Sequence, residues 1–109
     1  MNLEEELKSE SGYYLISSYS SGCFFGKIKK YDESHGVAIL SDSRRLRRWR
    51  IKNKKGSSLA EISLKGLDAQ YTEVCGKIDS MLVSEILELI PLSLKIAAEI
   101  SEFKVHNDD

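Results

Sequence analysis

Two β-rich runs separated by a short small-residue turn constrain the fold of this chain most strongly. The first run spans residues 13–19, the turn is Ser20-Ser21-Gly22, and the second run spans residues 23–31. The second run alternates along its length, so Phe24, Gly26, Ile28 and Lys30 are predicted on one face and Cys23, Phe25, Lys27, Lys29 and Tyr31 on the other. This pattern predicts a β-hairpin.

The next segments predict a third strand followed by a highly basic stretch. Residues 32–36 form a polar turn that ends in glycine, and residues 37–40 predict a short strand antiparallel to the second one. Asp42-Ser43 is predicted to break this strand. As a strand, the basic stretch would place Arg45, Arg47, Trp49 and Ile51 on one side and Arg44, Leu46, Arg48 and Arg50 on the other.

The second half of the chain predicts two helices and a further strand. Ser58 and Glu61 have the spacing of a capping box before a short helix, and Gly66 is placed as its C-cap. Residues 71–74 predict a brief extended piece, whereas residues 81–90 fit a strand or a helix equally well by periodicity. Ser93 is predicted to cap a last helix that reaches about residue 104.

These elements predict an α+β fold in one domain. Its small antiparallel β-sheet holds a three-stranded N-terminal meander and a later strand, with a short middle helix and a C-terminal helix. We expect residues 1–10 to form an acidic segment, as a short helix or a frayed end, residues 11–105 to form the domain, and residues 106–109 to form a polar tail.

The charge of the chain is distributed very unevenly. The basic segment, residues 44–55, holds eight of the sixteen basic residues and no acid, although the formal net charge of the whole chain is −1. Apolar residues make up 41% of the chain, which excludes the class of disordered proteins. The sequence lacks an export signal and a membrane-spanning apolar run, so we expect a cytoplasmic protein without a membrane partner.

Four short motifs, in a fixed order, resemble an uncharacterised family of small proteins from tailed bacteriophages and prophages. That family has a Tyr-Ser-Ala-Gly-x-Phe-x-Gly hairpin, an Arg-Arg-Leu segment ending near Trp, and a late Ile-Ile-Pro. The matching pieces here are residues 19–26, residues 43–49, the 58–66 helix and residues 86–91. The resemblance implies a phage setting and a strand over residues 81–90, but no established activity. The chain departs from the pattern at Ser21, where alanine is usual, and at Arg47 and Arg48, where an aromatic residue often stands.

The basic segment predicts an anion-binding site. Guanidinium groups form paired, planar hydrogen bonds with phosphate and also stack on aromatic rings. Tyr19, Phe25 and Trp49 are candidate stacking surfaces, and Ser20 is a candidate phosphate contact. The predicted ligand-binding residues are Arg44, Arg45, Arg47, Arg48, Trp49, Tyr19, Ser20 and Phe25. A solvated or ion-paired arginine face is the equally weighted alternative.

No catalytic or metal-binding motif is evident in the sequence. His35 and His106 lie in a turn and in the tail, Cys23 and Cys75 are too widely separated for a zinc motif, and the glycines do not form a phosphate-binding loop. We therefore expect a non-enzymatic protein without cofactor or metal. Both cysteines are expected to be reduced and mostly buried.

Three functions remain open from the sequence. The first is a phage protein that sequesters a phosphorylated nucleotide-type immune signal of the host, such as a cyclic oligonucleotide or a cyclic ADP-ribose, in a pocket between subunits of a homo-oligomer. The second is an inhibitor whose arginines dock on an acidic host protein. The third, less favoured, is a nucleic-acid-binding protein.

Overall fold

The computed structural model describes residues 6–51, 59–68 and 70–105. Its N-terminal part is an antiparallel meander of β1 (Tyr13–Ser18), β2 (Gly22–Asp32) and β3 (Val37–Arg48). The predicted hairpin and the predicted third strand are therefore confirmed. Of the predicted N-terminal segment, residues 6–10 are described: Glu6 is helical, and residues 7–10 form a turn followed by irregular backbone. The predicted polar tail, residues 106–109, lies outside the described residues.

Three further strands complete a six-stranded sheet in the described residues. The strand β6 (Ile86–Pro91) pairs with β1, while β5 (Met81–Val83) and β4 (Glu73–Val74) pair with the two ends of β3. The later strand is thus confirmed, but residues 81–90 form two strands instead of one. Between them, Glu85 adopts a positive φ of 54°, which turns the chain.

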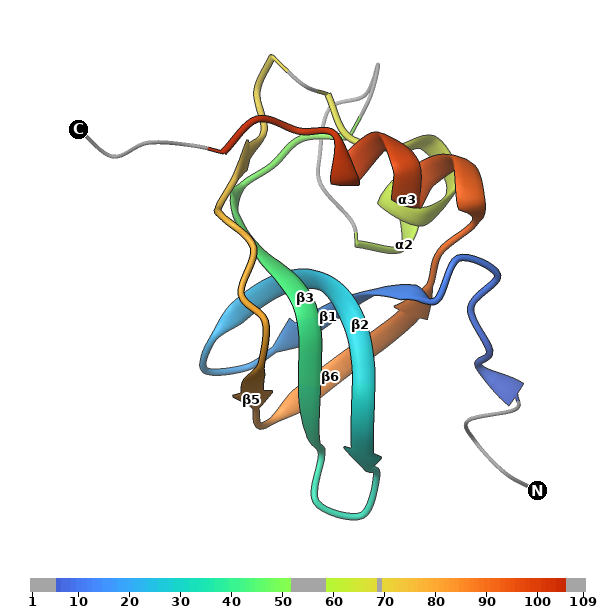
Figure 1. The fold of residues 1–109 in the computed structure, drawn as a ribbon, viewed down its shortest axis with the longest axis vertical. Helices are drawn as coiled ribbons and strands as arrows, with labels where there is room; N and C mark the ends of the chain where they lie inside the picture. Colours follow the sequence, from blue (N-terminus) through green and yellow to red (C-terminus); the bar gives the residue numbers. More distant parts are fainter. Residues whose placement is uncertain (1–5, 52–58, 69, 106–109) are drawn as a thin grey trace.

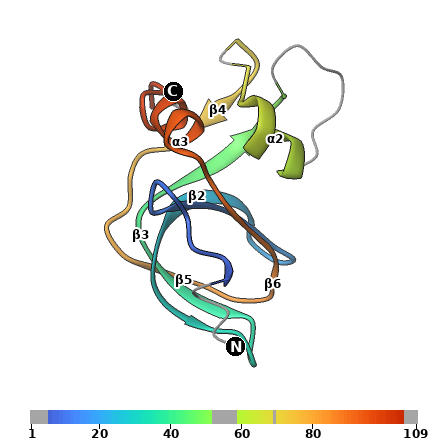
Figure 2. The same ribbon diagram turned by 90° about the vertical axis from the view of Figure 1, so that its right-hand side faces the viewer.

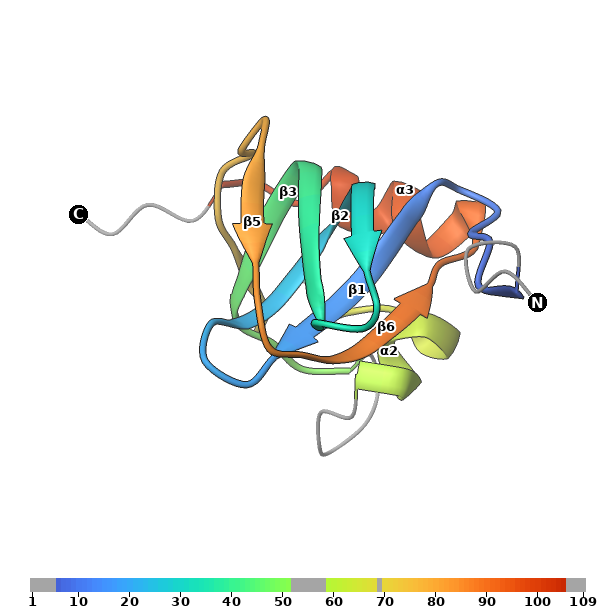
Figure 3. The same cartoon turned by 90° about the horizontal axis from the view of Figure 1, so that it is seen from below.

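The sheet curls strongly on itself, as Figures 2 and 3 show. At the point of closure, the backbone N–H of Ile86 at the start of β6 donates a hydrogen bond of 3.0 Å to the carbonyl of Gly36, in the β2–β3 turn. The concave interior holds the inner cluster, which consists of Ile16, Phe24, Ala38, Leu40 and Val83. One face of the meander therefore lines the inside of the curled sheet.

The two helices pack against the opposite face, near the C-terminal end of β3 (Figure 1). They are α2 (Leu59–Lys65) and α3 (Leu94–Ser101), and both were predicted. The backbone N–H of Ile96 donates a hydrogen bond to the Oγ of Ser93, which caps α3 as expected. The outer cluster beneath the helices consists of Leu15, Phe25, Leu46, Ile51, Ile62, Leu67, Val74, Leu92, Ile96, Ala97 and Ile100.

The ends of the helices differ in how well they match the prediction. Gly66 has a φ of +87° and its N–H donates a 2.8 Å hydrogen bond to the carbonyl of Ile62, as a left-handed C-cap requires. The helix α3 ends at Ser101, three residues before the predicted end at Lys104. The predicted cap at Ser58 lies outside the described residues.

The prediction that Asp42-Ser43 breaks the third strand is wrong. Instead, Asp42 adopts a φ of 49° and the pairing with β2 changes register there, so the strand bends and continues to Arg48. Aspartate tolerates the left-handed conformation better than most residues, and an extra residue in one strand forms a bulge. Beyond this bulge, β3 carries the first part of the basic segment, residues 44–48.

Bulges also overturn two predicted facings. A register shift between Ile28 and Lys30 places Tyr31 with the inner cluster, although alternation predicted the opposite face. A second shift, between Leu46 and Arg48 against β4, returns Trp49 and Ile51 to the side of the outer cluster. A strict period of two fails beyond each bulge because one residue is left without a partner.

Candidate functional site

The C-terminal end of β3 carries a pocket bordered by arginines. Its volume is about 320 Å³. We call it the arginine pocket, and its lining residues are Arg48, Trp49, Arg50, Gln70, Tyr71 and Glu73. Half of these residues come from the basic segment, and the other half are Gln70 and Tyr71, which precede β4, and Glu73, its first residue.

Non-local strand pairing and backbone hydrogen bonds build the arginine pocket. Arg48 lies opposite Glu73 in the β3–β4 ladder. Two residues after Arg48, the backbone of Arg50 forms two further hydrogen bonds. The N–H of Asp68 donates to the carbonyl of Arg50 at 2.8 Å, and the N–H of Arg50 donates to the hydroxyl of Thr72. These contacts hold residues 70–73 beside Arg48 and Arg50.

The arginine pocket combines cationic and aromatic groups. The guanidinium carbon of Arg50 lies 4.4 Å from the centroid of the Tyr71 ring, within the range of a cation–π contact. Trp49 is half-buried, and packing against the outer cluster holds its ring in place. The pocket therefore offers positive charge beside ring surfaces that are already held in place.

The pocket also contains one acid. The carboxylate of Glu73 lies 3.9 Å from the Nε of Arg47, and both side chains are partly exposed. A pair of this kind contributes at most about 1 kcal/mol because water screens it. Glu73 lowers the positive charge of the pocket without removing it, since Arg48 and Arg50 also line the cavity.

Arg44 is placed away from the other predicted arginines. It is only 5% exposed, and its guanidinium donates to three carbonyl oxygens, those of Cys75, Ile100 and Ser101, at 2.8, 3.2 and 3.4 Å. Ile100 and Ser101 end α3, where a cation is stabilised by the helix dipole. The structure thus gives Arg44 a role in the core, and it does not line the arginine pocket.

The remaining predicted ligand-binding residues are scattered. Arg45 is exposed on the other side of β3, with its guanidinium 4.9 Å from the centroid of the buried Phe24 ring. Phe25 is 1% exposed and stacks on Tyr13 at 4.5 Å in the outer cluster. Tyr19 is 80% exposed and Ser20 is also exposed, both in the β1–β2 turn. Of the eight predicted residues, the structure brings only Arg48 and Trp49 into the pocket, with Arg47 at its edge through Glu73.

Sequence reasoning did not identify three of the residues that line the pocket. Arg50, a fourth, belongs to the arginines considered for anion recognition, although it was left out of the final set of predicted ligand-binding residues. Gln70, Tyr71 and Glu73 lie about twenty residues further along the chain. The extended piece predicted over residues 71–74 was the available signal, but its pairing with β3 was not evident.

Cys23 carries a half-buried free thiol and packs, like Trp49, against the outer cluster. Burial raises the pKa of Cys23, the nearby Glu88 carboxylate raises it further, and the hydrogen bond with Trp49 opposes both effects. A raised pKa keeps the thiol protonated at neutral pH, and only the thiolate is a good nucleophile. Cys23 therefore acts here as a packing residue at the outer cluster.

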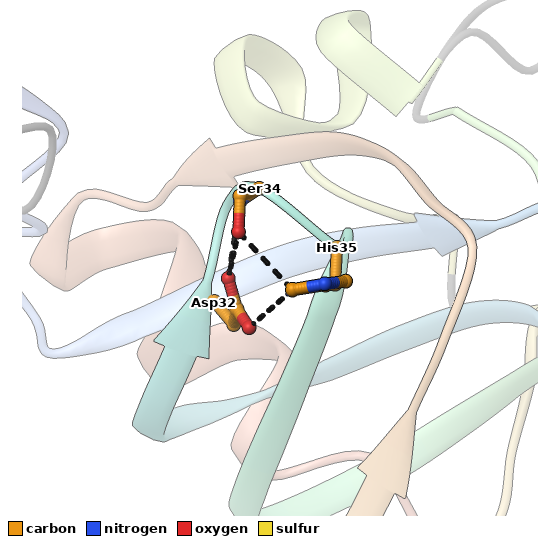
Figure 4. Close-up of polar contacts among 3 residues, drawn as sticks. All are labelled: Asp32, Ser34 and His35. Carbon is orange, nitrogen blue, oxygen red and sulfur yellow. Dashed lines mark hydrogen bonds and ion pairs between the residues drawn. The ribbon is translucent and has the colours of Figure 1, made fainter.

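A second polar cluster, in the β2–β3 turn, joins Asp32, Ser34 and His35 (Figure 4). The Nδ1 of His35 lies 2.7 Å from Asp32 Oδ2 and 3.1 Å from Ser34 Oγ, and Ser34 Oγ donates to Asp32 Oδ1 at 2.7 Å. A catalytic triad uses the two different ring nitrogens of histidine for the acid and the serine. Here both partners meet the same nitrogen, on an exposed turn, so this arrangement closes the turn and is not a triad.

The turn predicts a pH dependence of stability. Hydrogen bonds from Ser34 and then from His35 lower the pKa of Asp32. Because the folded pKa is the lower one, the contribution of Asp32 to stability is present above its unfolded pKa of about 3.9 and is lost as the pH falls through the folded pKa. We expect Asp32→Asn to lower the melting temperature slightly at neutral pH, and this difference to shrink as the pH falls below about 4.

Thermal unfolding of both proteins from pH 7 downward measures this effect, with the adjacent exposed acid variant Glu33→Gln as the control. Equal pH profiles for the Asp32 and Glu33 variants would show that the turn contacts do not stabilise the fold.

Two broader properties follow from the described residues. In the ranges that the structure describes, no helix has the length and apolar character needed to span a membrane. Across the same ranges, no three histidine, cysteine or acidic side chains gather in a way that could hold a metal ion.

In the described residues, the fold and the pocket define a small α+β protein with a curled antiparallel sheet, two helices on its outer face and a cationic, aromatic pocket at the end of β3. Residues 11–100 match the family described as "Domain of unknown function (DUF6948)", and the chain belongs to that family. No curated protein and no solved structure matches the chain.

Proposed function

We propose that this protein binds a phosphorylated, nucleotide-type ligand in the arginine pocket and does not chemically transform it. The observation that carries the proposal is the convergence of Arg48 and Arg50 with Trp49 and Tyr71 in one cavity of about 320 Å³. Arginine provides paired hydrogen bonds for phosphate, and aromatic rings provide stacking surfaces for a base. Both halves of a nucleotide thus have matching groups in the same pocket.

We propose a binding protein and not an enzyme because the pocket residues are better suited to ligand recognition than to catalysis. The lining residues include one carboxylate, that of Glu73, which lies within ion-pair distance of Arg47. The nearby thiol of Cys23 has a raised pKa, which disfavours nucleophilic attack. Binding without turnover is sufficient to keep a signal molecule from its receptor.

The proposed biological setting is a phage protein in the cytoplasm of a host cell, where it sequesters an immune signal of the cyclic oligonucleotide or cyclic ADP-ribose class. The resemblance of the sequence to small phage and prophage proteins supports this setting. The size of the pocket supports a homo-oligomer, because about 320 Å³ is near the lower limit of roughly 300–1,000 Å³ for pockets that enclose drug-sized ligands. A second copy would supply the remaining wall around a cyclic dinucleotide.

Isothermal titration against a panel of cyclic di- and trinucleotides and cyclic ADP-ribose isomers tests this proposal. We expect saturable binding, and we expect Arg48→Ala with Arg50→Ala to weaken it by about tenfold or more, since charge-assisted hydrogen bonds contribute about 1.5–3 kcal/mol each when shielded from water. Arg45→Ala is the matched control, because Arg45 is also exposed on β3 but does not line the pocket.

Two results would contradict the proposal. The first is the absence of binding for the whole panel at ligand concentrations of tens of micromolar. The second is an equal loss of affinity in the Arg45 control and in the pocket variant, which would indicate a general effect of positive charge.

The alternative function is docking of the arginines on an acidic host protein. Arg45, Arg47 and Arg48 are all exposed along the end of β3, so the cationic surface is wider than the pocket itself. A pull-down from host lysate with the Arg45→Ala and Arg47→Ala variants separates the two functions, because this docking requires residues outside the pocket. Salt-dependent binding of random oligonucleotides would favour the nucleic-acid function instead.

A further inference from the structure

The curled sheet has a second cavity, which residues 28–31 near the C-terminal end of β2 help to line. The arginine pocket lies at the C-terminal end of β3, which pairs with the opposite end of β2. The second cavity has a volume of about 210 Å³, and we call it the mouth pocket. Four of its lining residues, Tyr14, Ile28, Tyr31 and Leu89, are partly buried members of the packing around the inner cluster. The mouth pocket is therefore an open extension of the hydrophobic interior.

One polar group in the wall of the mouth pocket is already engaged. The Tyr14 hydroxyl donates a 2.7 Å hydrogen bond to the carbonyl of Leu7 and accepts one of 3.2 Å from the N–H of Ser9. These bonds hold Leu7 over one side of the cavity, which it also lines. A ligand would consequently meet carbon surface over most of this wall.

Positive charge at the mouth pocket comes from two consecutive lysines. Lys29 and Lys30 both line the cavity, and the register shift between Ile28 and Lys30 marks a bulge at this place in β2. Consecutive residues of a regular strand point to opposite faces, so a bulge is a means of bringing two neighbours to one cavity. Neither lysine forms an ion pair with a described carboxylate, and both are exposed.

We propose that the mouth pocket binds a small amphiphilic anion, with its apolar part in the curled sheet and its carboxylate beside Lys29 and Lys30. The apolar walls and the paired ammonium groups match the two parts of such a ligand. Ligand pockets commonly occupy the mouths of β-barrels, and the end of a strongly curled sheet offers a comparable concave, apolar opening. A cavity of about 210 Å³ is smaller than the roughly 300 Å³ lower limit for drug-sized ligands, which favours a short acyl or aryl carboxylate over a whole lipid.

Titration of the ¹⁵N-labelled full chain with sodium octanoate, followed by NMR, tests the proposal. The comparison ligands are 1-octanol, which has the chain without the charge, and acetate, which has the charge without the chain. We expect octanoate to shift the resonances of the mouth-pocket residues saturably and to bind on the order of tenfold more tightly than octanol.

The variant Lys29→Gln with Lys30→Gln should remove the advantage of octanoate over octanol. The matched control is Lys77→Gln with Lys95→Gln, which removes the same charge from two exposed lysines elsewhere and should leave binding unchanged. Arg48→Ala should also leave it unchanged, because Arg48 lines the other pocket. These variants change exposed side chains, so they are expected to fold.

The proposal would be overturned by any of three outcomes. These are no saturable shift with octanoate, equal affinity for octanoate and octanol in the unmodified protein, and equal shifts with octanoate and acetate. Nucleotide binding at the arginine pocket does not enter this test, so the two proposals stand or fall separately.

Discussion

Replacement of Arg44 by alanine is expected to lower the free energy of unfolding by about 3 kcal/mol, because it removes three hydrogen bonds from a charged donor and leaves a cavity in the core. The carbonyls of Cys75, Ile100 and Ser101 would lose their donor. For a domain of about 100 residues, this loss corresponds to a decrease of roughly 15 °C in the melting temperature. Thermal and urea unfolding measure both quantities.

The matched control for Arg44 is its neighbour. Arg45 is exposed and has a cation–π contact with Phe24, so Arg45→Ala should cost at most about 1 kcal/mol. Arg44→Lys should recover only part of the loss, because an ammonium cannot reproduce the planar set of guanidinium donors. Equal effects of the two alanine variants would contradict the structural role of Arg44.

The contrast between Arg44 and Arg45 shows what the sequence could and could not predict about the site. Alternation correctly places the two arginines on opposite faces of a strand. It does not show which face meets α3, because that depends on how a helix fifty residues later packs on the sheet. The burial of Arg44 against the end of α3 therefore depends on tertiary packing, and the sequence of the arginine run does not reveal it.

The strands and helices were predictable where local residue chemistry determines them. The Ser20-Ser21-Gly22 turn, the Ser93 cap and the Gly66 C-cap each marked the end or the start of an element correctly. Asp42 was wrongly predicted to end the third strand because aspartate occurs both at bulges and at strand ends, and the sequence does not distinguish the two. Its positive φ bends β3 without ending it.

The arginine pocket was only half predictable for a similar reason. Arg48 and Trp49 belong to a conspicuous local segment, whereas Tyr71 and Glu73 reach the pocket through pairing with β4, a strand of two residues. Such a short strand has almost no periodicity of its own. Its position depends on the hydrogen bond from Asp68 to Arg50 and on burial of Val74 in the outer cluster.

Gly26→Ala is expected to cost about 2 kcal/mol, because the new methyl group would have to displace a neighbouring strand. An added Cβ at Gly26 would lie 2.9 Å from the Cβ and 3.0 Å from the Cα of Ser43 in β3. Gly26 is buried at the register shift between β2 and β3, where the backbones approach closely. The contact includes backbone, so rotation of a side chain cannot relieve it.

Gly76→Ala is the control for this prediction, because its nearest neighbour would be a Val105 methyl group at 3.8 Å and its φ is not positive. It should change the free energy of unfolding by less than about 0.5 kcal/mol. In the Gly26→Ala background, Ser43→Gly should restore part of the loss, which a double-mutant cycle measures as a coupling of about 1 kcal/mol. If the cycle shows no coupling between the two positions, β3 can shift at the bulge without cost. In that case Gly26 would not determine the direction in which β3 continues toward the arginine pocket.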